Sequence, residues 1–136
     1  MTTKTEQIIA KVGALLTTAG IANRTDTSNP YSFEDAPAII VDCGNEVPEP
    51  VLSTGFVYWN LTISLWIIAQ GATPKLAPET TRNTAHGALY ADRTLGGLVI
   101  DIAVGQIIRQ IDHVNPAAGI TEAQYTIKYR AMEGTL

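Results

Sequence analysis

The clearest pattern in the sequence is an alternation of apolar and polar positions from residue 56 to residue 70. The odd positions in this stretch are all apolar, whereas polar residues occupy half of the even ones. Because successive side chains of a β-strand point to opposite faces, the odd set predicts the core-facing side of a strand. About 15 residues is long for a strand, so we expect it to project beyond the core and to meet another surface. Trp59 is then predicted in the core, and Trp66, on the opposite face, becomes a candidate interface residue.

Two helices are predicted from apolar residues that recur every three or four positions. The first covers residues 4–19, where Thr3 and Glu6 have the spacing of a capping box. The second covers residues 79–91 and follows Pro78, a residue that suits the first turn of a helix.

Three further segments have strand character. A short β-branched run predicts a strand at residues 38–42, and we expect residues 45–50, with two prolines, to end it. Alternation predicts a last strand at residues 119–132. Residues 98–114 fit both periods: Ile107, Ile108 and Ile111 have helical spacing, whereas Ile100, Ile102 and Val104 alternate as in a strand.

With residues 104–114 opposite the last strand, the elements follow the order α-β-β-α-β-β. This order predicts an α+β fold in one domain spanning residues 1–136, with a mainly antiparallel sheet and both helices packed on one of its faces.

A polar run without an apolar period predicts a long exposed loop at residues 21–36. The loop carries Arg24, Tyr31 and Phe33, and exposed aromatic residues beside arginine are typical of interfaces. We therefore expect these residues to contact a neighbouring subunit or another protein of the same assembly. A merely flexible connector is the alternative.

Charge excludes one broad class of function. The 136 residues carry 9 Lys plus Arg against 13 Asp plus Glu, a net charge of −4, so a basic nucleic-acid-binding face is not expected. Charged residues make up 16% of the chain, which is below the roughly 25% of typical soluble domains and hints at surfaces covered by other subunits. We also expect no membrane segment and no export signal, so the chain should remain in the cytoplasm where it is made.

The sequence contains no recognisable active site. The lone Cys43 excludes an internal disulfide, and Gly96 and Gly97 lack the spacing and the lysine of a phosphate loop. The two histidines, His86 and His113, have no metal-ligand spacing around them. Three carboxylates could still line one site, although nothing in the sequence brings them together: Asp92, Asp101 and Asp112. We therefore expect no catalytic, cofactor-binding or metal-binding residues and no enzyme activity.

Four segments, taken in order, resemble phage tail terminator proteins of the minor tail protein U type. They are residues 35–41 (DAPAIIV), the long strand from residue 59 to residue 69, residues 86–98 (HGALYADRTLGGL) and residues 125–130 (YTIKYR). The resemblance runs from about residue 5 to the end of the chain. The TLGGL stretch after a helix and the tyrosine-rich last strand carry most of it.

The resemblance implies a six-subunit ring on the distal end of a completed tail tube. Such a ring stops tube polymerisation and provides the surface to which the head connector docks, so the expected partners are other copies of the chain, the major tail tube protein and the head–tail connector protein. The expected location is the tail of the virion, after assembly in the host cytoplasm. The resemblance implies no catalytic residues.

A ring has a consequence for charge. Six copies at −4 each carry −24, and acidic side chains lining the bore would repel passing DNA rather than bind it specifically. The candidates are Asp26, Glu34, Glu46 and Glu49. Another neck or head–tail joining ring protein remains the first alternative, and a small ligand-binding domain or enzyme is the second.

Overall fold

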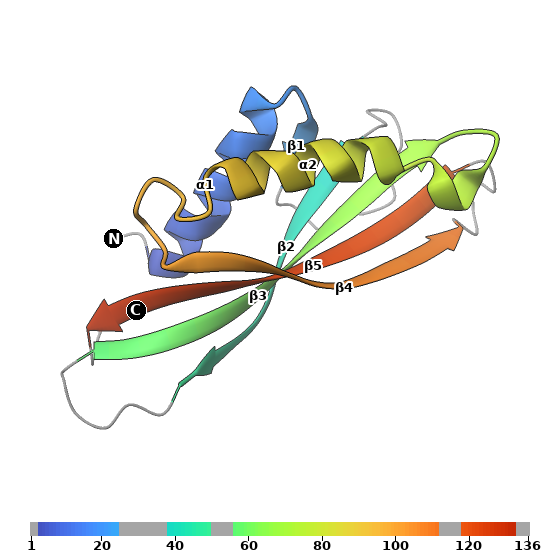
Figure 1. The fold of residues 1–136 in the computed structure, drawn as a ribbon. Helices are drawn as coiled ribbons and strands as arrows, with labels where there is room; N and C mark the ends of the chain where they lie inside the picture. The colour runs from blue at the N-terminus through green and yellow to red at the C-terminus, as the bar shows by residue number, and fades with distance from the viewer. Residues whose placement is uncertain (1–2, 25–37, 50–55, 112–117, 133–136) are drawn as a thin grey trace.

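The computed structural model describes residues 3–24, 38–49, 56–111 and 118–132. Within these residues, five strands form one mixed sheet, and two helices lie together over one of its faces (Figure 1). The elements are α1 (Lys4–Thr18), β1 (Ala22–Arg24), β2 (Ala38–Pro48), β3 (Phe56–Gln70), the short 3-10 helix η1 (Pro74–Leu76), α2 (Glu79–Ala91), β4 (Asp101–Ile111) and β5 (Ala118–Met132). The predicted α+β class is confirmed, and the predicted element order holds apart from the additional short strand β1.

The strand order across the sheet is β1-β2-β3-β5-β4. β1 pairs in parallel with β2, and every other pairing is antiparallel. β3 and β5 pair along their whole lengths, from Phe56 opposite Met132 to Gln70 opposite Ala118. The end of the sheet where β3 begins and β5 ends extends beyond the helices (Figure 1).

The core lies between this sheet and the two helices. Ile8, Val12 and Leu16 of α1 are fully buried, as are the odd-numbered β3 residues Leu61 and Ile63. The helix begins as predicted, because the side chain of Thr3 accepts a hydrogen bond from the Glu6 amide. Trp59 packs partly buried against this core, in agreement with its predicted face.

The second strand is longer than predicted. We expected residues 45–50 to end it, but β2 continues to Pro48. Cys43 pairs with Ile63 and Glu46 pairs with Leu61, so one extra residue forms a bulge that carries the strand onward. Pro48 is tolerated because, among the described residues, no strand pairs with the outer side of β2 at this position, so no strand partner there requires a backbone amide.

The ambiguous segment contains a strand. β4 occupies Asp101–Ile111, and its register with β5 shifts between Val104 and Ile107. The extra residue moves the apolar positions from even to odd numbers, so Val104 and Ile107 lie on the same face. This shift explains why residues 98–114 keep neither the helical spacing nor the strand alternation along their whole length.

The start of the predicted 21–36 loop is also different. Ile21 is buried, and Ala22–Arg24 form β1 against Ala38–Ile40. Residues 25–36 lie outside the described residues, and with them the candidates Asp26, Tyr31, Phe33 and Glu34.

Candidate functional site

β4 is an edge strand with an apolar exposed surface. Large apolar side chains that are exposed by 38–46% lie on it or directly before it: Ile100, Val104, Ile108 and Ile111. Natural proteins usually blunt exposed edge strands, because the unpaired backbone of such a strand recruits other chains. The exposed edge of β4 is therefore the first candidate contact surface, and the sequence analysis did not single it out.

Side chains from α2 and the turn after it cover the first half of this edge. Arg93 Nη2 donates to the Ile102 carbonyl at 3.1 Å, and the Val104 amide donates to Tyr90 Oη at 3.0 Å. Arg93 also pairs with Asp101 at 2.9 Å and lies over the Tyr90 ring. The Ile102 carbonyl and the Val104 amide are thus already hydrogen-bonded to side chains of the same chain.

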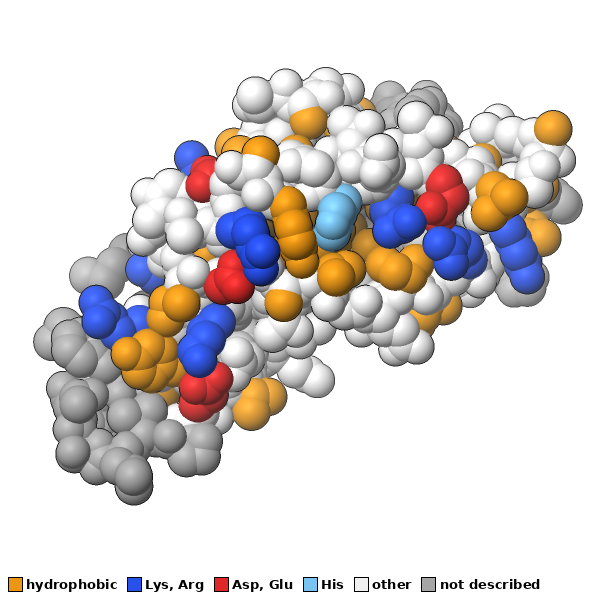
Figure 2. Space-filling view, in the orientation of Figure 1, with side chains coloured by type: hydrophobic (Ala, Val, Ile, Leu, Met, Phe, Trp, Pro, Cys, Tyr) orange, Lys and Arg blue, Asp and Glu red, His pale blue; other side chains and the backbone are white. Residues whose placement is uncertain are grey.

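A basic cluster that includes Arg109 lies beside the second half of the edge, residues 106–111. Glu79 of α2 pairs with Arg109 Nε at 2.9 Å and with Arg82 Nη2 at 2.8 Å. The hydrogen bond from Arg82 is the largest of the effects that lower the pKa of the Glu79 carboxyl. One carboxylate shared by two guanidinium groups leaves this cluster net positive, and Figure 2 shows basic, acidic and apolar side chains gathered along this side of the molecule.

β2 presents a free edge on the opposite side of the sheet. β1 pairs only with Ala38–Ile40, so residues 41–48 have no strand partner on that side among the described residues. Cys43, Gly44 and Asn45 are exposed there, and Val47 is exposed by 58%. The charged side chains of β2 are both acidic: Asp42 and Glu46.

Two of the predicted bore-facing carboxylates have partners within the chain. Glu46 accepts hydrogen bonds from Tyr129 Oη, at 2.6 Å, and from Thr5. Glu49 accepts from Asn60 at 3.0 Å and pairs with Lys128 at 3.1 Å, and the hydrogen bond from Asn60 is the largest effect that lowers its pKa. The other two, Asp26 and Glu34, lie outside the described residues.

The structure places two of the four predicted interface residues. Trp66 is partly buried on the sheet face away from the helices, where it packs on a small cluster of Ile40, Ile68 and Ile120. Arg24 is the last residue of β1, and its side chain is not among those described.

The titratable residues that could have carried chemistry have separate structural contacts. His86 Nδ1 lies 2.9 Å from Tyr125 Oη in the space between α2 and the sheet. Burial is the main effect that raises the pKa of Tyr125 to about 12. Asp92 accepts from the Gly96 amide and Asp101 pairs with Arg93, whereas Asp112 and His113 lie outside the described residues. No group of three potential metal ligands occurs among the described residues.

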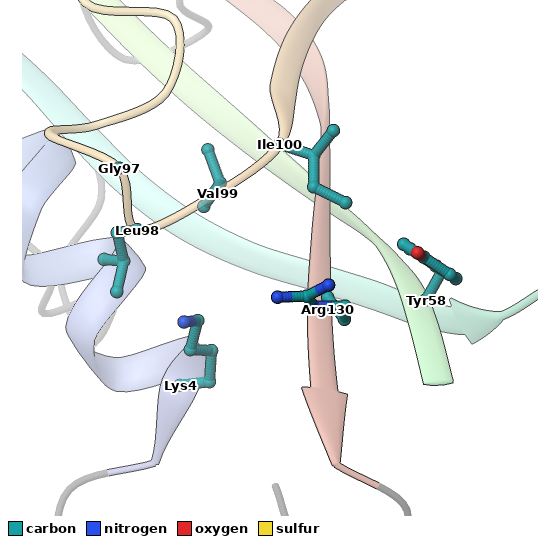
Figure 3. Close-up of a pocket in the computed structure, with 7 residues that line it drawn as sticks. All are labelled: Lys4, Tyr58, Gly97, Leu98, Val99, Ile100 and Arg130. Atoms are coloured by element: carbon teal, nitrogen blue, oxygen red, sulfur yellow. The ribbon is translucent and has the colours of Figure 1, made fainter. Parts of the chain in front are cut away.

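A pocket of about 320 Å³ lies where α1 meets the end of the sheet. Its described lining consists of Lys4, Tyr58, Gly97, Leu98, Val99, Ile100 and Arg130. Figure 3 shows the Arg130 side chain extending from β5 toward α1, and the Lys4 side chain on α1 directed toward the segment that contains Leu98. This lining contains basic groups but no carboxylate, histidine or cysteine, so it lacks the cluster of acids that would favour an active site.

No helix in the described part of the chain is long and apolar enough to cross a membrane. No protein-family model matches the sequence, and the search of curated proteins found no match.

Proposed function

We propose that this chain is a phage tail terminator, which forms a ring of six copies on the completed tail tube. The ring stops tube polymerisation and offers the head connector its docking surface. The partners are other copies of the chain, the tail tube protein and the connector, and the site of action is the virion tail.

One observation carries the proposal: in the described part of the chain, the sheet has two exposed edges, β4 and β2, that leave backbone groups and apolar side chains available to other chains. Ile108 and Ile111 on one edge and Val47 on the other are exposed by 38–58%. In a chain with only 16% charged residues, such surfaces favour assembly with other subunits over an isolated monomer.

The motif that carries most of the resemblance has a folding role that suits this proposal. Thr94–Leu98 is the turn that leads from α2 toward β4, and Leu95, Gly96 and Gly97 all have positive φ. Leu95 is only 2% exposed and belongs to the core. Buried Leu95 therefore joins the turn between α2 and β4 to the core.

The decisive experiment measures tail length by electron microscopy in particles that lack this gene. Overlong, irregular tubes without heads are expected, and the intact gene supplied in trans should restore normal length. Tails of normal length that fail to join heads would indicate a neck protein instead. Normal infectious particles would overturn both assembly roles and return attention to the Lys4–Arg130 pocket as a ligand site.

A further inference from the structure

The two free edges of the sheet are of similar length and differ in charge. Residues 106–111 of β4 and residues 41–48 of β2 have no strand partner on their outer sides among the described residues. A free edge presents a row of unpaired backbone donors and acceptors, which a strand from another chain can satisfy.

The charges on the two edges are opposite. Near the free half of β4 lie Arg109 and Arg82, which share the single carboxylate of Glu79. Lys75 belongs to η1, which contacts β4. The free part of β2 carries two acidic residues and no basic one: Asp42 and Glu46. Glu49, just beyond the strand, is already paired with Lys128 and adds no net charge. Opposite charges on two surfaces favour the encounter between those surfaces and disfavour pairing of either with itself.

We propose that the free half of β4 in one copy pairs with the free part of β2 in the next copy, so that the partner is a second copy of this chain. The inference rests on the proposed function and deepens it, because it states how one ring subunit meets its neighbour. The two surfaces differ, so the contact is heterologous and repeats from copy to copy, which closes into a ring when the rotation between copies allows it.

The direction of the strands fixes the kind of pairing. The antiparallel pairings β2–β3, β3–β5 and β5–β4 make β2 and β4 run in opposite directions within one copy. A rotation about an axis along the strands preserves these directions, so β4 meets the next β2 in antiparallel orientation.

The structure also limits the length of the contact. Arg93 and Tyr90 already hydrogen-bond the Ile102 carbonyl and the Val104 amide, so we place the start of the pairing after the β4 bulge. An overlap of residues 106–111 supplies about six backbone hydrogen bonds between copies. Exposed Ile108 and Ile111 gain burial in the same step.

Cys43 provides a direct test because it is the single cysteine of the chain, lies on the free part of β2 and is exposed. Its partner in β3 is core-facing Ile63, so Cys43 belongs to the helix side of the sheet. Directly opposed residues of an antiparallel pair lie on the same side, at Cα separations that a disulfide can bridge. The β4 residues on the helix side are Ile107, Arg109 and Ile111, opposite Ala123, Thr121 and Gly119.

The experiment places one new cysteine at a time in β4 and adds an oxidant. At least one of Ile107→Cys, Arg109→Cys and Ile111→Cys should give a ladder of disulfide-linked oligomers on a non-reducing gel. Gln110→Cys, which lies on the other side of the sheet, is the matched control and should give no ladder. The unaltered protein can form no species larger than a Cys43–Cys43 dimer, because each copy has one thiol. The ladder should disappear when Cys43→Ser is added.

The variants are tested as concentrated purified protein and in assembled particles, with circular dichroism to confirm that each is folded. Absence of a ladder from all three helix-side variants in both settings would overturn the pairing. Cross-linked dimers that persist with Cys43→Ser would also overturn it, because they would show β4 pairing with β4.

Failure of this inference is distinguishable from failure of the proposed function. Overlong tails in particles lacking the gene, together with no ladder, leave the terminator role standing and remove the edge pairing. A ladder from purified protein, together with normal tails in the absence of the gene, would leave the edge pairing standing and remove the terminator role.

Discussion

Tyr129 Oη donates a hydrogen bond of 2.6 Å to the Glu46 carboxylate, which joins β5 to the bulged part of β2. The same carboxylate oxygen accepts a hydrogen bond from Thr5 of α1. Burial, followed by the hydrogen bond to Glu46, raises the pKa of Tyr129 to about 12. Glu46 therefore links the first helix to both β2 and β5, although its sequence neighbours made it a candidate for a solvent-filled bore.

The first prediction concerns this link. Glu46→Ala removes the acceptor of two hydrogen bonds and should lower the free energy of unfolding by about 1–3 kcal/mol. Glu46→Gln retains an acceptor oxygen at the same place and should cost less than about 1 kcal/mol. Urea unfolding followed by circular dichroism measures both. Glu49→Gln, which alters an exposed ion pair with Lys128, is the control and should leave the midpoint nearly unchanged. Equal losses from Glu46→Ala and Glu46→Gln would contradict the assigned role.

The second prediction concerns charge in the bore. Since Glu46→Lys would disturb the fold, the informative substitutions are Asp26→Lys, Glu34→Lys and Glu49→Lys. If these side chains line the bore, a basic replacement attracts DNA phosphate, and infectivity should fall while tails keep their normal length. Plaque counts and electron microscopy measure the two effects separately. Glu6→Lys, an exposed acidic position of α1 outside the candidate set, is the matched control. Unchanged infectivity with intact tails would remove the acidic-bore hypothesis.

The third prediction compares two glycines of α2 and the turn beyond it. A Cβ added at either Gly87 or Gly97 would meet no atom within 4 Å, but Gly97 has φ +90°. Gly97→Ala should therefore destabilise the fold by about 1 kcal/mol through backbone strain. Gly87→Ala, in the helix, should stabilise it by about 0.5–1 kcal/mol. Thermal unfolding of the two variants should show shifts in opposite directions, and a shift in the same direction for both would contradict this account of the turn.

The sequence predicted the elements that keep one period throughout. β3 has an apolar residue at every odd position, and both helices bury the apolar face that the spacing indicates. β2 and β4 were misjudged or ambiguous because each contains a bulge, and one inserted residue reverses which positions face the core. Gly44 marks the first bulge: a Cβ there would lie 2.7 Å from the Thr62 carbonyl oxygen. A single glycine in a sequence does not indicate a bulge by itself, and Gly44 is recognised as part of one only from the register of β2 with β3.

The candidate surface was even less accessible to sequence reasoning. Arg24 was chosen for its residue type, and Trp66 for its residue type and its face of the predicted strand. A free sheet edge depends instead on strand order, and the order places β4 at the border of the sheet. The partners of Glu46 and Glu49 come from segments as distant as Tyr129 and Lys128. Contacts of such sequence separation are set by the three-dimensional pairing of strands and leave no local pattern.

The fourth prediction uses the two buried tyrosines. Burial raises the pKa of Tyr125 and of Tyr129 to about 12, whereas an unfolded tyrosine has a pKa of about 10. Between these values the folded chain retains protons that the unfolded chain releases. The contribution of the two raised tyrosine pKa values to the free energy of unfolding is therefore fully present below about pH 10 and is lost as the pH rises toward 12.

Tyr125→Phe removes one of the two buried tyrosine hydroxyls. It therefore removes part of the fall in the free energy of unfolding that is expected between pH 10 and 12. The variant is expected to be less stable at pH 8, because His86 Nδ1 loses its partner 2.9 Å away. The difference from the unaltered protein should then shrink between pH 10 and 12, where the unaltered protein loses stability more steeply. Adding Tyr129→Phe should flatten the alkaline decline further. Urea midpoints at half-unit steps of pH measure this, and parallel curves for all three proteins would show that the folded-state pKa of these hydroxyls does not control alkaline unfolding.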